Sequence, residues 1–241
     1  MKGWGGTIAI LLCLVWLAPA TWAGQNLLIK GIEAQKAGRN ELAVDLLSRY
    51  VKQYPQIPDA RRHLALALAG LGRETEALQE LNQGLAKNPQ DIQLLLAKAN
   101  LLAGMNRRPE AIEVLTLALK CDPKNAEALK ERGECQAQEG CFPEAMADLD
   151  RAAKLNPMDP WVYNKRGMVW FCQGEYQKAV ADFTTAIRLA SDSPHAYFFR
   201  ANIYRHHLGE TDKAVADYRQ ACKLGHPLSC RELEKLGAKE K

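Results

Sequence analysis

Residues 161–187 read WVYNKRGMVWFCQGEYQKAVADFTTAI, and the spacing of small and large residues in this stretch decides the fold. Gly167 is followed after twelve positions by Ala179, and Ala179 after four positions by the large apolar Phe183. The same kinds of residue return at a constant interval, as small residues at Gly31, Ala65, Ala99 and Gly133, alanines at Ala43, Ala77, Ala111 and Ala145, and leucines at Leu47, Leu81, Leu115 and Leu149. A 34-residue period of this kind is typical of stacked helical hairpins.

Close packing explains why these residue types recur. Small side chains let two helices approach each other, and a large apolar side chain fills the space beside them. Within one unit, Ile112, Leu115 and Leu119 follow at three- and four-residue steps, as on one face of a helix. Proline ends one helix and begins the next, and prolines stand between the units at Pro55, Pro89, Pro123 and Pro157. The pattern predicts antiparallel pairs of short helices that packing stabilises.

This pattern resembles the tetratricopeptide repeat family, whose 34-residue units carry small residues at positions 8 and 20, an aromatic residue or leucine at 24, and proline at 32. The matching units are residues 24–57, 58–91, 92–125, 126–159, 160–193 and 194–228. The resemblance implies an all-α, right-handed superhelical solenoid of antiparallel helix pairs, forming a single domain from residue 24 to residue 241. Residues 229–241 are expected to form a C-terminal capping helix with a polar outer face.

The sixth unit departs from the period by one position. The alanine expected at position 213 stands one place later, at Ala214, and Lys213 takes its place. The stretch from His206 to Gly209 lies between the two expected helices of this unit. We therefore predict one extra residue in that turn.

Residues 1–23 have the composition of a secretory signal peptide. Lys2 precedes an apolar run from Ile8 to Leu17, and small residues follow as far as Ala23. Cleavage is expected after Ala23 or, as the second choice, after Ala20. The run is shorter than the ~20 residues of a membrane helix, so no stable membrane span is expected after cleavage. An exported protein, periplasmic or secreted, is predicted, and a membrane anchor formed by the uncleaved segment is the alternative.

The composition is that of an ordinary globular chain, with 47% hydrophobic and 25% charged residues. The net charge of +4 is small, and basic and acidic residues are interspersed along the sequence. Nucleic-acid-binding domains instead gather lysine and arginine on one face, so nucleic acid is not an expected partner.

Catalytic motifs are missing from the sequence. It holds no Cys-x-x-Cys, no His-Glu-x-x-His, no phosphate-binding loop and no Gly-x-Ser-x-Gly. A metal site would have to be assembled from His206, His207 and His226 with Cys222 and Cys230, but adjacent histidines point apart on a helix. We therefore expect no enzyme activity, no cofactor and no bound metal.

An exported chain can form disulfides, and six cysteines follow the predicted leader. Six cysteines allow 15 complete pairings, which the sequence cannot distinguish. The best single candidate is Cys222 with Cys230, because a helix end, a Gly-His-Pro turn and a helix start can bring them together. The alternative is that the cysteines are small buried residues in helix interfaces.

In tetratricopeptide repeat proteins the first helix of each unit lines a concave groove, chiefly through positions 2, 5, 9, 12 and 13. The resemblance implies a groove that is polar in its first half and rich in aromatic and amide side chains in its second half. The partner-binding residues it implies are Arg62, Asn100, Lys130, Trp161, Asn164, Phe171, His195, Phe198, Asn202 and Arg205, and Glu134, Met168 and Cys172 hold further groove positions. The alternative for Trp161 is that it only covers the preceding hairpin.

These observations lead to one main hypothesis and two alternatives. The main hypothesis is an exported adaptor that binds a peptide segment or a partner helix in its groove, in the assembly of an envelope, pilus or secretion structure. One alternative is a structural module that self-assembles into a homo-oligomer. The other is a metal-binding protein or thiol-dependent enzyme that uses Cys172 and the histidines.

Overall fold

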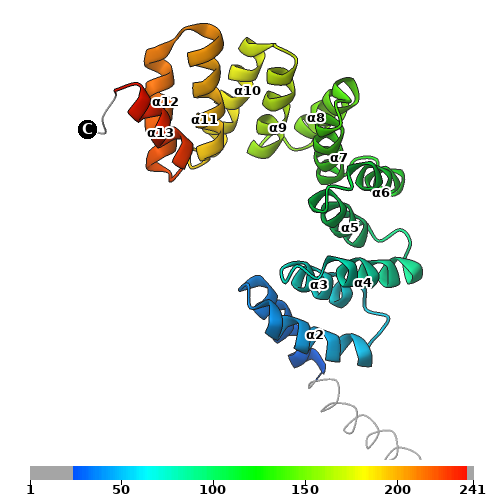
Figure 1. The fold of residues 1–241 in the computed structure, drawn as a ribbon. Coiled ribbons are helices and arrows are strands. Elements are labelled where there is room, and N and C mark those ends of the chain that lie inside the picture. The colour runs from blue at the N-terminus through cyan, green and yellow to red at the C-terminus, as the bar shows by residue number, and fades with distance from the viewer. Residues whose placement is uncertain (1–23, 238–241) are drawn as a thin grey trace, which may run out of the picture. The chain divides into compact units, whose positions relative to one another are not determined.

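The computed structural model describes residues 24–237, and every regular element within them is helical. The helices follow one another as antiparallel pairs joined by short turns (Figure 1). The predicted signal peptide and its cleavage sites lie outside the described residues, as does the end of the predicted capping segment, 238–241. The prediction of an all-α solenoid of helix pairs is confirmed.

The helices group into two compact units, one that ends at Cys121 and one that begins at Asp122. In the first unit, a helix described from residue 24 to 36 pairs with α2 (Asn40–Gln53), α3 (Pro58–Ala69) with α4 (Glu74–Lys87), and α5 (Ile92–Gly104) with α6 (Arg108–Cys121). In the second, α7 (Ala126–Gln138) pairs with α8 (Phe142–Leu155), α9 (Pro160–Cys172) with α10 (Tyr176–Leu189), and α11 (Pro194–Ile203) with α12 (Thr211–Lys223). The last helix described, α13 (Pro227–Lys235), packs on α12.

The turn inside each hairpin needs one residue with a left-handed backbone. Gly72 and Gly174 supply it with φ angles of 73° and 76°. Glycine adopts this conformation without a steric penalty. Between α5 and α6 the same place is taken by Asn106, with φ of 62°, and asparagine tolerates this region better than most residues do.

The recurring small and large residues meet inside the hairpins, as the period predicts. Ala145 and Leu149 of α8 are fully buried, and Gly133 of α7 packs directly against them. A Cβ atom on Gly133 would lie 2.9 Å from Cγ of Leu149 and 3.1 Å from the carbonyl oxygen of Ala145. The two helices of this hairpin can approach so closely only because the residue is glycine.

A ladder of arginine–aspartate pairs joins the helices of the second unit. Each arginine on a first helix donates two hydrogen bonds to an aspartate on the second helix of its hairpin. The pairs are Arg132–Asp148 at 2.6 and 2.9 Å, Arg166–Asp182 at 2.8 and 2.7 Å, and Arg200–Asp217 at 2.7 and 2.8 Å. The arginines recur once per repeat, at the same repeat position each time.

Two of these arginines also reach the preceding hairpin. Arg166 donates to Asp150 of α8 at 2.8 Å, and Arg200 donates to the hydroxyl of Thr184 of α10 at 2.8 Å. The hydrogen bonds to Asp182 outweigh burial and raise the pKa of Arg166. The ladder therefore holds each of the three hairpins closed, and Arg166 and Arg200 also attach their hairpins to the preceding one.

The sixth hairpin contains the predicted extra residue. Helix α11 runs into a π-helical turn, Tyr204–Leu208, which ends at Gly209 with a φ angle of 71°. A π-turn takes one residue more than an α-turn between hydrogen-bonded groups. This explains why Ala214 and Asp217 stand one place later than the period would put them.

Candidate protein-binding groove

Among the described residues, two clefts at corresponding repeat positions lie between successive first helices, and a further cleft of about 270 Å³ between the starts of α3 and α5 is lined by Asp59, Arg62 and Gln93. In the first unit, the α3–α5 cleft of about 280 Å³ is lined by Ala65, Leu66, Ala69, Glu74, Leu81, Ala97, Asn100, Leu101 and Gly104. In the second, the α7–α9 cleft of about 420 Å³ is lined by Glu134, Ala137, Gln138, Phe142, Lys165, Met168, Val169 and Cys172. These volumes fall near the lower end of the range of ligand-binding clefts, about 300–1,000 Å³.

The two clefts are built from the same repeat positions. Most residues of one cleft are followed, two periods later, by a residue of the other. The corresponding pairs are Leu66 and Glu134, Ala69 and Ala137, Glu74 and Phe142, Ala97 and Lys165, Asn100 and Met168, Leu101 and Val169, and Gly104 and Cys172. The fold thus makes one kind of cleft twice, and the side chains give each cleft its own chemistry.

The α7–α9 cleft combines an apolar floor with charged groups. Val169 is almost fully buried, and Met168 is partly exposed beside it. Lys165 of α9 donates a hydrogen bond to Glu134 of α7, and this ion pair joins the two helices at the cleft. Cys172, at the end of α9, has an exposed side chain. An apolar side chain can therefore be buried here while polar groups of the same ligand find partners.

A family model described as tetratricopeptide repeat matches residues 30–92, 96–160 and 171–226. The chain belongs to the tetratricopeptide repeat family. This assignment confirms the resemblance found in the sequence and makes the protein a scaffold for protein–protein interaction. No curated protein matches the sequence.

Several solved tetratricopeptide repeat structures are similar to this one. The structure titled "Functional Characterization of Pseudomonas Aeruginosa pilF" superposes with a TM-score of 0.75 at 18% identity, over 89% of this chain and 98% of that one. That of PilW, titled as a "widely conserved type IV pilus biogenesis factor", gives 0.74 at 20% identity, over 82% and 91%. YrrB, titled as a "TPR protein with an unusual peptide-binding site", gives 0.58 at 16% identity, over 78% and 97%. At these identities the similarity shows the shared fold.

Between α9 and α11 the place of a further cleft is filled by aromatic rings. Phe171 and Tyr176 stand one period after the cleft residues Ala137 and Phe142. The ring of His207 stacks on Tyr176 with centroids 3.9 Å apart and meets Phe171 at 5.6 Å. His207 belongs to the π-helical turn. The turn that contains the extra residue of this repeat therefore also supplies the ring that packs here.

The four predicted groove residues of α11 and its π-helical turn contact α12, α13 or the turn between them, and His195 is exposed as well. The rings of His195 and Phe198 lie 5.3 and 4.3 Å from the ring of His226, which precedes α13. Asn202 accepts a hydrogen bond of 2.6 Å from the hydroxyl of Tyr218 on α12. Arg205 forms an ion pair with Glu232 of α13. Phe198 and Arg205 thus contact the cap and the body of the capping helix, whereas Asn202 bonds to the second helix of its own hairpin.

Two of the predicted cationic groove residues are engaged within the protein. Lys130 is buried and donates hydrogen bonds to Glu127 at 2.5 Å and to Asp159 at 3.2 Å. Burial lowers the pKa of Lys130, but the hydrogen bonds and charges of these carboxylates outweigh it, so the pKa is raised. Arg62 donates to the carboxylate of Asp59 at 2.5 and 3.2 Å.

Asn100, Trp161 and Asn164, three further predicted groove residues, differ in their surroundings. Asn100 lines the α3–α5 cleft. Trp161, at the start of α9, is 58% exposed, so it is not simply a cover for the preceding hairpin. Asn164 has a buried side-chain oxygen that accepts no hydrogen bond from the described residues. Sequence reasoning missed Phe142 and Lys165 in the α7–α9 cleft, although their distance of two periods from Glu74 and Ala97 was visible in the sequence.

The structure joins Cys222 to Cys230 in a disulfide, the pair singled out in the sequence. Their Cα atoms lie 5.0 Å apart, within the usual range for a disulfide. Cys135 is buried, whereas Cys121, Cys141 and Cys172 are exposed. Among the residues that the structure describes, no group of three or more metal-ligating side chains comes together. Within residues 24–237, no helix is long and apolar enough to cross a bilayer.

Proposed function

We propose that this tetratricopeptide repeat protein is an exported adaptor that binds a segment of another protein in the α7–α9 cleft during assembly of an envelope structure such as a pilus. The observation that carries the proposal is the cleft itself, where an apolar floor lies beside the Lys165–Glu134 ion pair. A peptide side chain can bury its apolar part against Met168 and Val169. The peptide backbone can bond to the polar groups beside them.

The repeated cleft supports a protein segment as the ligand. The two clefts are formed by the same repeat positions, and the lining residues give them different side chains and volumes. The α3–α5 cleft is lined mostly by alanine and leucine with Asn100 and Glu74, while the α7–α9 cleft holds the Lys165–Glu134 ion pair and a thiol. Each cleft therefore suits a different kind of side chain, which is how a repeat protein discriminates between peptide sequences.

Export and the pilus context rest on two further supports. The N-terminal residues have the composition of a signal peptide, with an apolar run and small residues before Ala23. The similar structures include PilW, which its title calls a type IV pilus biogenesis factor. Similarity of fold between chains of low identity supports a shared role by analogy alone. The pilus is therefore named as one example of an envelope assembly.

Paired capture from a native envelope extract tests the adaptor function. The bait is residues 24–241, either unchanged or with Met168→Glu, which places a charge on the cleft floor. The matched control is Met158→Glu, the same substitution at a methionine that is 71% exposed and does not line the cleft. We expect the unchanged chain and the Met158→Glu variant to capture the same proteins, and the Met168→Glu variant to lose at least one.

Two other results, and one control, decide how the capture is interpreted. If the Met168→Glu and Met158→Glu variants capture the same proteins, the cleft is not the binding site. If only cytoplasmic proteins bind to the unchanged chain, the envelope role is wrong while the cleft can still be right. A circular-dichroism spectrum of each variant shows beforehand that the bait is folded, so a lost partner reports on binding.

A further inference from the structure

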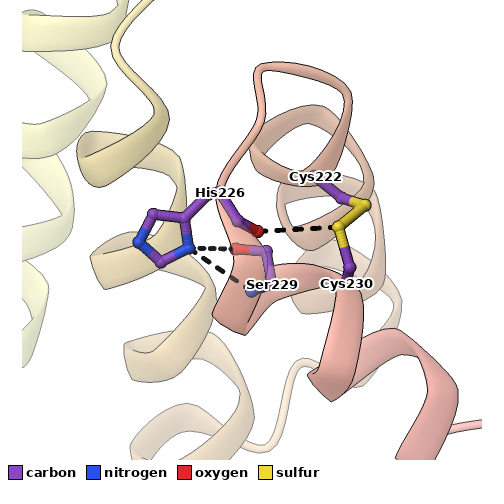
Figure 2. Close-up of a disulfide and its surroundings, with 4 residues drawn as sticks. All are labelled: Cys222, His226, Ser229 and Cys230. Atoms are coloured by element: carbon purple, nitrogen blue, oxygen red, sulfur yellow. Dashed lines mark hydrogen bonds between the residues drawn. A yellow bond between two sulfur atoms is a disulfide. The ribbon is translucent and has the colours of Figure 1, made fainter.

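The last helix begins at a histidine that caps it. His226 immediately precedes Pro227, the first residue of α13, and its side chain is buried, with the residue 9% exposed. The ring atom Nδ1 accepts a hydrogen bond from the backbone N–H of Ser229 at 3.3 Å and lies 3.0 Å from the Ser229 hydroxyl (Figure 2). The first N–H groups of a helix have no partner inside the helix, so the neutral imidazole satisfies one of them.

Other first helices of the chain are capped by side chains of a different kind. Asp91 caps α5, Asn125 caps α7 and Asp159 caps α9, each by accepting a backbone N–H. Asparagine does not titrate, and aspartate keeps its charge down to about pH 4. Histidine is the residue whose ordinary pKa, about 6.5, lies near neutral pH. The capping helix is thus held by a group that changes its hydrogen-bonding capacity under mild acid.

The surroundings of His226 oppose its protonation. Burial lowers its pKa, and the nearby His195 of α11 lowers it further. On α13, Glu232 pairs with Arg205 and with Lys235, and Arg231 and Glu234 are the other charged residues of the helix. Lys223 is the last residue of α12. Tyr218, also on α12, contacts the ring of Phe198, and the ring of His226 packs against the same phenylalanine.

The helix that His226 caps covers part of the predicted binding face of α11, while His195 stays exposed. Leu233 of α13 is buried in a cluster with Ala201 and Tyr218, and Phe198 packs on the same cluster. Arg205, in the π-helical turn that continues α11, pairs with Glu232 of α13. The Cys222–Cys230 disulfide anchors the first turn of α13 to the end of α12, and Cys230 Sγ lies 3.6 Å from the carbonyl oxygen of His226 (Figure 2).

We propose that α13 is an acid-released latch, in which protonation of His226 removes the helix cap and lets α13 swing away from the α11 face while the disulfide keeps it attached. A protonated imidazole carries a hydrogen on Nδ1, so it can no longer accept the N–H of Ser229. Its positive charge then lies at the positive end of the helix dipole and close to His195. Opening uncovers Phe198 and frees Arg205 from Glu232, two of the side chains that the sequence predicts to bind a partner. The latch does not depend on the identity of the partner.

The direction of the pH effect follows from the lowered pKa. Because the folded state lowers the pKa of His226, the unfolded or opened state binds more protons in mild acid. The contribution of His226 to the stability of docked α13 is therefore present above its unperturbed pKa of about 6.5. It is lost as the pH falls from there through the lowered pKa of the docked state.

Hydrogen exchange of α13 tests the latch directly. Exchange of the amides of residues 229–236 is measured by mass spectrometry in the oxidised chain, 24–241, at about pH 7.5 and about pH 5.5, with rates corrected for the intrinsic pH dependence of exchange. In the unchanged chain we expect protection to fall about fivefold at the lower pH, the effect of a lost helix cap. In a His226→Asn variant, whose side chain caps without titrating, protection should stay the same at both values.

Two further variants separate the latch from general acid sensitivity. His226→Ala removes the cap at every pH, so protection should be low and equal at both values. His195→Gln leaves the cap but removes the neighbouring titratable group, so the difference between the two pH values should shrink. Equal acid sensitivity in the unchanged chain and in the His226→Asn variant would overturn the proposal. So would full protection of α13 at the lower pH in the unchanged chain.

Discussion

Arg166 and Asp182 are joined by two parallel hydrogen bonds, from Nε at 2.8 Å and from a terminal guanidinium nitrogen at 2.7 Å. They lie 16 residues apart in the sequence and face each other across the α9–α10 hairpin. Asp182 is only 6% exposed, so its charge depends on the guanidinium for a partner. The same relationship recurs in the neighbouring hairpins of the second unit.

Removing the arginine of this pair should destabilise the second unit strongly. Arg166→Ala leaves the buried carboxylate of Asp182 without its partner, which we expect to cost about 3 kcal/mol of unfolding free energy. Urea unfolding followed by circular dichroism measures this loss. Lys178→Ala is the control, because Lys178 is exposed, and its pair with Glu175 and its contact with the Trp170 ring at 4.5 Å are each worth about 1 kcal/mol or less. Equal losses for the two variants would mean that the ladder does not stabilise the hairpin.

Adding a methyl group should have opposite effects at two helical glycines. Gly133→Ala forces a Cβ atom against Leu149 and Ala145, and we expect a loss of about 1–2 kcal/mol. Gly104→Ala meets no atom within 4 Å and should raise stability by about 0.5–1 kcal/mol, because alanine loses less backbone entropy in a helix. Thermal melting of both variants gives the two signs. A stabilised Gly133→Ala variant would show that α7 and α8 are not packed as the structure has them.

Asn202 and Tyr218 should be coupled in a double-mutant cycle. Asn202→Ala leaves the fully buried Tyr218 hydroxyl without the acceptor it has here, and we expect a loss of about 1–2 kcal/mol. Tyr218→Phe in the Asn202→Ala background removes the orphaned donor, so the second substitution should cost less there than in the unchanged chain. Additive losses, measured by urea unfolding, would contradict a direct hydrogen bond between the two residues.

Reduction of the disulfide should loosen the C-terminal end of the second unit. The Cys222–Cys230 bridge closes a loop with a sequence separation of 8, and loops of this size contribute about 2–3 kcal/mol. We expect the melting temperature of the unchanged chain to fall when a dithiol reductant is added. A variant with Cys222→Ser and Cys230→Ser should melt low with or without the reductant, and Cys121→Ser should melt like the unchanged chain. A reductant effect of the same size in the doubly substituted variant would assign it to another cause.

Much of the fold could be predicted from the sequence because the determining residues repeat. Gly167, Ala179 and Phe183 specify one hairpin, and their counterparts one or more periods away specify the others. Even the extra residue of the sixth hairpin was visible, because Ala214 is displaced by one position. Periodicity is a local property of the sequence, and helical hairpins depend mainly on local spacing.

The binding site was harder to predict because it depends on what covers each groove position. Repeat position alone cannot show that α13 covers Phe198 and that Glu232 pairs with Arg205. Nor does it show that Lys130 is buried between two carboxylates. The Arg166–Asp182 pair was equally hidden, since an arginine and an aspartate so far apart in sequence face each other only when the hairpin has formed.

Cross-linking from Cys172 tests the central claim most directly. A photoreactive maleimide is attached to Cys172 of a chain in which Cys121 and Cys141, the other exposed free cysteines of the described residues, are replaced by serine. The labelled protein is illuminated in native envelope extract, and the cross-linked peptides are identified by mass spectrometry. A matched probe on a Met158→Cys variant that also carries Cys172→Ser reports on chance encounters at an exposed residue outside the cleft. The α7–α9 cleft account predicts adducts between Cys172 and one defined segment of an envelope protein, abolished by Met168→Glu. The same scattered adducts from both labelled positions would contradict it.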